Sequence, residues 1–175
     1  MSNSILDLPF VGQTRRNHAL EHATLHVLAA KYPGRMMGGH SNPSGFFILG
    51  NVSLQDMADA AAEALGRLRA GERELAIHPG CGTNLATSVL LASTFGWFVL
   101  RGTRSTVGRM LRLPFAFAFA LLGLAISRPL GPVLQQKFTT DADVGEMRVV
   151  EVRESAGPAR TFGGRLMAHR VITRS

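Results

Sequence analysis

Two long apolar runs dominate the middle of the chain. No residue between Glu74 and Arg101 carries a formal charge, and the run from Leu113 to Ser127 is again uncharged. The second run continues to residue 134 if the Arg128 side chain snorkels toward the membrane surface. A helix that crosses a membrane needs about 20 apolar residues. The pattern therefore predicts a two-helix transmembrane hairpin over residues 77–134.

The segment between the two runs is strongly basic. Residues 101–112 contain four arginines and no acidic residue, as expected for a polar loop at the tip of a hairpin. The alternative is a helical hairpin buried in the core of a soluble protein. A surface helix of such a protein has a polar face. The Phe/Ala/Leu-rich second run has none, so we favour the membrane hairpin.

The polar segments on both sides of the hairpin predict an α+β fold. Ser53 is a suitable N-cap, with Asp56 three residues later, and Gly71 is suited to end the helix that follows. The expected elements are helices over 13–31 and 54–70, a Gly-rich turn over 38–45, and strands over 46–49, 148–153 and 166–172. We therefore expect a helix-strand-helix domain at 1–76, completed by C-terminal strands at 135–175.

Charge and cysteine content narrow the partners. The net charge is +7, from 19 Lys+Arg against 12 Asp+Glu, which suggests nucleic acid or an anionic membrane surface. The basic residues are scattered arginines without a recognition helix or an aromatic-stacking motif, so we expect a lipid bilayer and no nucleic acid. The single cysteine, Cys81, excludes an intrachain disulfide. Residues 1–12 do not have the pattern of a cleavable signal peptide.

The first predicted helix carries an H-x-x-E-H pattern. His18 and His22 lie one turn apart on the same helix face, so both imidazoles can reach one metal ion. Glu21 lies beside that face and could take a proton from a metal-bound water. The motif resembles that of the inverzincin metallopeptidases, which implies zinc as cofactor and Glu21 as catalytic base. The alternative is a polar helix face, extended by His26, whose histidines are merely solvated.

A zinc site requires a third protein ligand. A hairpin returns the chain to the side of the membrane that it left, so donors that flank the hairpin lie on the same side as the first helix. We therefore take His78 as the first choice, followed by Cys81 and Asp141. The inverzincin resemblance implies a glutamate on a later helix, for which Glu63 is the nearest analogue. In the alternative, HPGCGTN is only a turn whose Thr83 or Asn84 caps the first span.

A second resemblance extends over the whole chain. The segments NHALEHATLHVL, GFFILGNV, HPGCGTN and TTDADV resemble a bacterial family of uncharacterised membrane proteins. That resemblance implies a bacterial, membrane-bound protein and supplies no reaction.

Two functions follow from these patterns. The first is a membrane-bound, zinc-dependent peptidase that acts on a peptide or protein segment at the membrane surface, with the strand at 46–49 binding the substrate by edge pairing. The alternative is a non-catalytic scaffold or assembly protein whose α+β domain binds a partner. The basic loop at 101–112 favours an outside location for the two termini, whereas the absence of a signal peptide and the thiol of Cys81 favour the cytoplasm. We expect a multi-pass protein of the bacterial cell membrane with its polar domain in the cytoplasm.

Overall fold

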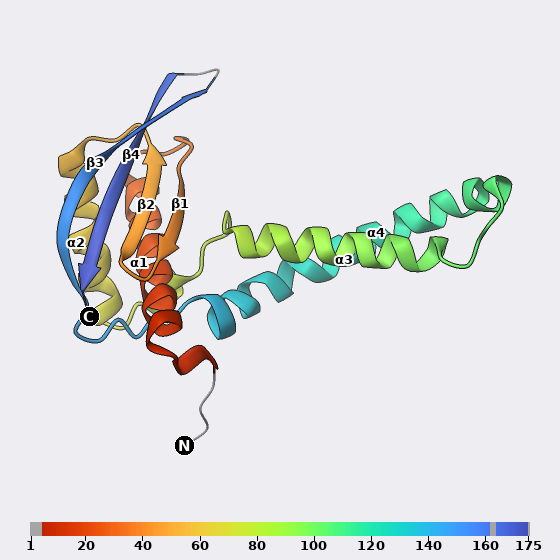
Figure 1. Cartoon of the computed structure of the whole chain (residues 1–175), viewed down its shortest axis with the longest axis horizontal. Helices are drawn as coiled ribbons and strands as arrows, with labels where there is room; N and C mark the ends of the chain where they lie inside the picture. Colours follow the sequence, from red (N-terminus) through yellow and green to blue (C-terminus); the bar gives the residue numbers. More distant parts are fainter. Residues whose placement is uncertain (1–4, 162–163, 175) are drawn as a thin grey trace. The chain divides into compact units, whose positions relative to one another are not determined.

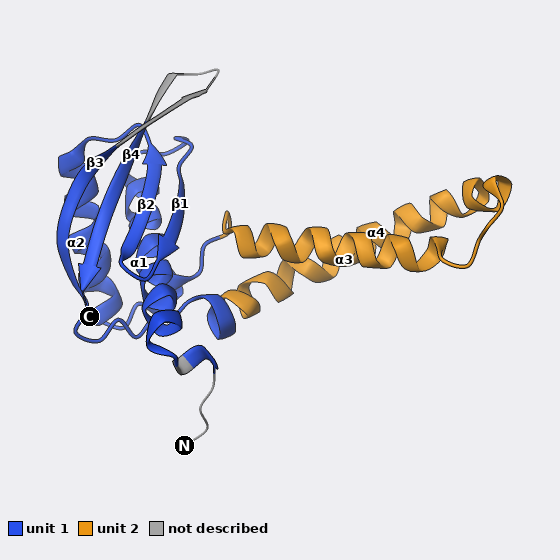
Figure 2. Ribbon diagram, viewed as in Figure 1, with its two compact units in different colours: residues 1–78, 136–175 blue, residues 79–135 orange. Residues whose placement is uncertain are grey.

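The computed structural model describes residues 5–161 and 164–174, which divide into two compact units. Unit 1 combines residues 1–78 with 136–175, and unit 2 is the continuous segment 79–135 (Figure 2). Unit 1 contains helices and a four-stranded antiparallel sheet, and unit 2 is a pair of apolar helices. The predicted α+β fold, interrupted by a helical hairpin, is confirmed.

Helix α1 (Pro9–Lys31) forms the centre of unit 1. It begins four residues earlier than the expected start at residue 13, because Pro9 lies in its first turn, where a missing N–H costs nothing. The helix ends at Lys31, and the N–H of the C-cap residue, Tyr32, donates to the carbonyl of Leu28. Leu20 and Leu28 are fully buried in the core of unit 1.

The sheet has the strand order β1-β2-β4-β3 (Figure 1). Strand β2 (Gly45–Gly50) pairs with both β1 (Gly38–Asn42) and β4 (Gly164–Arg174), and β3 (Arg148–Thr161) pairs with β4. On β2, Phe46 and Ile48 are fully buried, whereas Phe47 and Leu49, which alternate with them, are not. We call the face that carries Phe46 and Ile48 the inner face, and the opposite one the outer face.

Strand β1 corrects the prediction of a turn over 38–45. Glycine weakens strands, so Gly38 and Gly39 gave no strand signal, but both pair with the hydrophobic strand β2. The turn is confined to Pro43 and Ser44, between the two strands, and Gly45, the first residue of β2, has a φ of 135°. The prediction of substrate pairing along residues 46–49 is also wrong, because β2 has a neighbouring strand on each side.

Helix α2 (Leu54–Arg69) starts as its sequence predicts. The side chain of Ser53 accepts a hydrogen bond from the N–H of Asp56, and Met57, Ala61 and Ala64 are fully buried against the rest of the core. Helices α1 and α2 lie on the same side of the sheet (Figure 1). The 3₁₀ turn Arg73–Ala76 follows α2 and contacts α1.

Unit 2 consists of α3 (Gly82–Leu100) and α4 (Thr106–Leu134), and a π-helical turn, Gln135–Thr139, continues α4. Both helices are long and apolar enough to span a membrane. Their large side chains point outward: Leu90 is 67% exposed and Phe117 is 67% exposed. Small residues fill the contact between them, and a Cβ atom on Gly123 would lie 2.7 Å from the carbonyl oxygen of Leu91.

Candidate metal centre

Three histidines follow one face of α1. His18, His22 and His26 are spaced by four residues, and the ring centroids of His18 and His22 lie 4.3 Å apart. His22 is almost fully buried, with 1% of its surface exposed, and the other two are half-buried. The face is therefore not a row of solvated side chains, and an explanation for buried imidazoles is needed.

Main-chain carbonyls hold the first two rings. Nδ1 of His18 lies 2.9 Å from the carbonyl oxygen of Thr139, and Nδ1 of His22 lies 2.7 Å from that of Ala76. A carbonyl oxygen only accepts, so both Nδ1 atoms carry a hydrogen, and in the neutral rings the lone pair lies on Nε2. Metal-binding histidines commonly have this arrangement, in which an N–H to a carbonyl fixes the tautomer and the ring plane.

His78 joins these histidines from the segment that follows the 3₁₀ turn. Its ring centroid lies 5.6 Å from that of His22 and 5.1 Å from that of His26. Nε2 of His26 donates to the carbonyl of Ile77, so α1 holds two successive carbonyls just before His78. Burial, together with the charges of His22 and His26, lowers the pKa of His78 to about 4. The imidazole is therefore neutral at pH 7, the form that binds metals.

Glu21 lies against strand β1. It is 3% exposed, and its Oε2 accepts a hydrogen bond from Ser41 Oγ. A Cβ atom on Gly39 would collide with the carboxylate of Glu21, so a larger residue at this position of β1 would displace the Glu21 side chain. The i, i+3 spacing places Glu21 about 60° around the helix from His18, on the side of β1.

The remaining predicted ligands belong to other elements of the chain. Cys81 belongs to unit 2, where it is buried and caps α3 through an Sγ contact of 3.5 Å with the N–H of Thr83. This thiol, rather than the expected Thr83 or Asn84 side chain, occupies the N-cap. Glu63 is exposed on α2 and pairs with Arg67 at 3.6 Å. The carboxylate of Asp141 accepts from the N–H of Asp143.

Several residues that position the site were not predicted from the sequence. Ser41 and Gly39 position Glu21, and the carbonyls of Ala76 and Thr139 position the two histidines. A carbonyl partner has no side-chain signature, so sequence alone could not identify it. The Gly-Gly pair before Ser41 is the one signal that could have indicated a close approach of backbone to a functional side chain.

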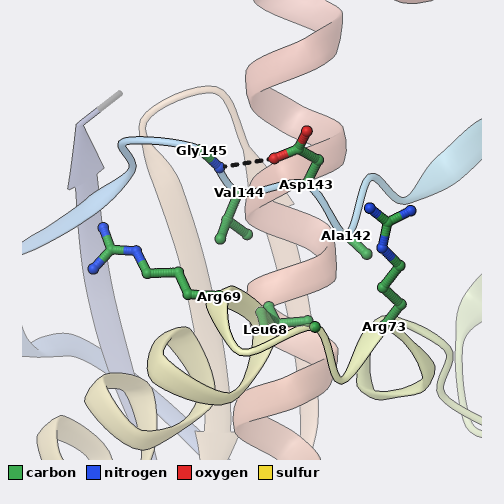
Figure 3. Close-up of a pocket in the computed structure, with 8 residues that line it drawn as sticks. Leu68, Arg69, Arg73, Ala142, Asp143, Val144 and Gly145 are labelled. Atoms are coloured by element: carbon green, nitrogen blue, oxygen red, sulfur yellow. Dashed lines mark hydrogen bonds between the residues drawn. The ribbon is translucent and has the colours of Figure 1, made fainter.

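Unit 1 also contains a cavity of about 260 Å³ at the end of α2 (Figure 3). Leu68, Arg69 and Arg73 form one wall, and residues 142–145 form the other. Arg69 donates to the carbonyl of Met147 (2.5 Å), and Asp143 accepts from the N–H of Gly145 (3.2 Å). None of the four histidines lines this cavity, so it is separate from the candidate metal centre.

Comparison with known proteins gives a family without an assigned reaction. An uncharacterised protein of Picosynechococcus sp. is 36% identical over 139 residues, which cover 72% of this chain and 65% of that protein. The chain thus spans about two thirds of the length of this relative. No solved structure gives a significant match. The family described as "Domain of unknown function (DUF6391)" matches residues 13–152, which include most of α1 and all of β1, β2, α2 and both hairpin helices. The chain is a member of the DUF6391 family.

Proposed function

We propose that this protein is a zinc-dependent hydrolase, anchored in the bacterial membrane, that cleaves peptide bonds. The observation that carries the proposal is that His18 and His22 are both held by a hydrogen bond from Nδ1 to a main-chain carbonyl. Both rings lie on one helix face and both donate Nδ1–H to a main-chain carbonyl, which leaves Nε2 as the nitrogen that binds a metal. Two solvated surface histidines would have no reason to share this arrangement.

The third ligand comes from the segment that follows the 3₁₀ turn. His78 supports this role because its ring lies 5.6 Å from His22 and its pKa of about 4 keeps it neutral. Cys81 follows three residues later in the chain and is the second donor that this segment offers. Nitrogen and sulfur donors of this kind favour zinc.

Glu21 has the role of general base. Its buried carboxylate accepts a hydrogen bond from Ser41 and packs against the backbone of Gly39, and both contacts favour this position of the side chain. Bound zinc would supply an acidified water and polarise the scissile carbonyl. Glu21 would accept the proton of that water and transfer it to the leaving amine. A peptide substrate is the class that the H-x-x-E-H motif implies.

The apolar helices α3 and α4 support a membrane anchor. Leu90 and Phe117 are exposed, as lipid-facing side chains would be, and the small residues lie between the helices. We propose that both helices cross the bacterial cell membrane, with unit 1 in the cytoplasm, where the thiol of Cys81 stays reduced. Reporter fusions at the two termini test this orientation. Activity of an export-dependent reporter at both ends would place unit 1 outside.

Metal analysis of the full chain in a neutral detergent tests the centre. We expect about one zinc per chain in the wild type, and a loss of affinity of at least about a hundredfold in His18→Ala and His22→Ala. His78→Ala and Cys81→Ala, measured side by side, identify the third ligand as the variant that loses zinc. His40→Ala is the matched control, since His40 is exposed on the outer face and should leave zinc binding unchanged.

Hydrolysis is measured on a quenched fluorescent protein substrate. Glu21→Gln should keep its zinc and lose about 10²–10⁴-fold in kcat, because the amide keeps the shape of the side chain but cannot accept the proton. Equal activity in this variant would remove Glu21 from the mechanism. A wild-type protein that binds no zinc would instead support the non-catalytic scaffold.

A further inference from the structure

The outer face of the sheet carries a basic row that the proposed function does not use. His40, Phe47, Arg170 and Arg153 are paired in register across β1, β2, β4 and β3. Residues directly opposite each other on antiparallel strands point to the same face, so all four side chains share the outer face. Helices α1 and α2 lie on the inner face, where Glu21 contacts β1.

Arg170 is held rigidly in this row. Its guanidinium stacks on the ring of Phe47 at 4.3 Å, and its Nη2 donates to Asn42 Oδ1 (3.0 Å) and Ser44 Oγ (2.7 Å). The residue is only 6% exposed, which is rare for an arginine on a sheet face without a helix. Its Nη1 is buried and has no hydrogen-bond partner among the described residues.

Arg153 lies directly opposite Arg170 on the neighbouring strand. Like charges in this position repel each other, and burial, together with this repulsion, lowers the pKa of Arg170. The nearest acid is Glu151, whose carboxylate is 3.7 Å from Arg153 and is half exposed, so its compensation is weak. The pair therefore has two guanidinium groups, and Nη1 of Arg170 has no acceptor among the described residues. The half-exposed carboxylate of Glu151 does not balance the two positive charges.

We propose that Arg153 and Arg170 form a binding site for a phosphate group on the outer face of the sheet. Guanidinium forks match the oxygens of a phosphate, and a dianion between them would neutralise both charges and satisfy Nη1 of Arg170. Phe47, Asn42 and Ser44 hold Arg170 in position before the ligand arrives. The side chain of Arg153 is 61% exposed and can rotate to admit the phosphate.

The experiment is a thermal-unfolding titration of the full chain in neutral detergent, with inorganic phosphate added at constant ionic strength. We expect the Tm of the wild type to rise along a saturable curve. Arg153→Gln should weaken binding by about tenfold or more, because one charged fork is lost. Without phosphate, this variant should be at least as stable as the wild type, since the repulsion is relieved. A merely structural arginine would instead lower the Tm of the free protein.

Arg148→Gln is the matched control. Arg148 faces Arg174 in the same sheet, and both are exposed, so the variant removes an equal charge without touching the buried fork. An equal weakening by Arg148→Gln, or an unchanged response in Arg153→Gln, would overturn the site, since phosphate would then act through diffuse charge. A parallel titration with glycerol 3-phosphate distinguishes the source. Binding of both ligands indicates a phosphate group carried on a larger molecule, and binding of inorganic phosphate alone indicates the free ion.

Discussion

The two units place polar and apolar side chains in opposite ways. In unit 1 the large apolar residues Phe46 and Ile48 are fully buried, and buried polar groups such as Asn17 and His22 have main-chain partners. In unit 2 the large apolar residues are exposed, and the interior contains small or polar ones, such as Gly123 and the hydrogen-bonded pair Ser88 and Ser127 (2.8 Å). This inversion is what we expect if unit 1 folds in water and unit 2 in a membrane, with apolar burial stabilising unit 1 and close backbone packing stabilising unit 2.

The largest effect is expected from a charge introduced on the lipid-facing surface proposed for the hairpin, because this surface differs most from the surface of unit 1. Leu90→Arg would place a guanidinium on the 67% exposed apolar side of α3, at an insertion cost of about 3 kcal/mol if that side faces lipid. We expect much less protein in carbonate-washed membranes. Met36→Arg, at a position that is 88% exposed in unit 1, is the control and should have no effect. Equal recovery of both variants would mean that α3 does not face lipid.

Removal of a buried polar group should have its large effect in unit 1. Asn17 donates to the carbonyls of Asn42 and Pro43 and accepts from Thr173 Oγ1, so Asn17→Ala leaves these groups without their partner. We expect a loss of about 2–3 kcal/mol in the free energy of unfolding, measured by urea denaturation. Thr14→Ala, which removes an exposed hydroxyl on the same helix, should cost less than about 0.5 kcal/mol. A similar loss in both variants would contradict this account.

An added methyl group should destabilise unit 2 where its two helices are in close contact, at Gly123, and have no effect where they are further apart, at Gly96. In Gly123→Ala the new Cβ would lie 2.7 Å from the Leu91 carbonyl oxygen, so the helices must move apart, at a cost of about 1–3 kcal/mol. In Gly96→Ala the nearest atom is 3.5 Å away, an ordinary contact, and we expect no loss. Thermal unfolding in detergent compares the two variants. Equal Tm values would show that the backbones are not closely packed at Gly123.

The smallest expected effect is the contribution of one half-buried histidine of unit 1, His78, to the pH dependence of the unfolding free energy. Folding lowers the pKa of His78 from 6.5 to about 4, so between these values the unfolded chain binds more protons. The contribution of His78 to stability is complete above pH 6.5 and is lost as the pH falls toward 4. In metal-free protein, His78→Asn should therefore flatten the decline in unfolding free energy between pH 7 and pH 4.5. A parallel decline in both proteins would mean that His78 keeps an ordinary pKa.

The sequence predicted those parts of the fold in which one local pattern dominates. The uncharged runs gave the hairpin, and Ser53 with Asp56 gave the start of α2, because length and capping are local properties. The pattern missed β1, because Gly38 and Gly39 form a strand only through their pairing with β2. The lengths of β3 and β4 were underestimated for the same reason, since cross-strand pairing continues beyond the apolar residues.

The candidate site was predictable to the same extent. Helical spacing predicted that His18 and His22 share one face, and their ring centroids lie 4.3 Å apart. His78, which follows the second predicted helix, lies 5.6 Å from His22, whereas Glu21 lies on the side of β1. The contacts that orient the side chains of the candidate site come from residues far away in the sequence. The carbonyl that holds His18 belongs to Thr139, 121 residues further along the chain, and Ser41 reaches Glu21 from the edge of the sheet. No periodicity in a single segment records such contacts.

The bond between His18 and Thr139 also fixes an order in time. A ribosome delivers α1 early, but Thr139 emerges only after both helices of unit 2 have been synthesised, and β4 follows later still. Until then the ring of His18 lacks the carbonyl that sets its tautomer, and β2 lacks a neighbour on one side. A nascent chain that stops before the second apolar helix therefore cannot complete the histidine cluster. The position of the hairpin within the gene thus delays the assembly of the site until both helices of unit 2 have been made.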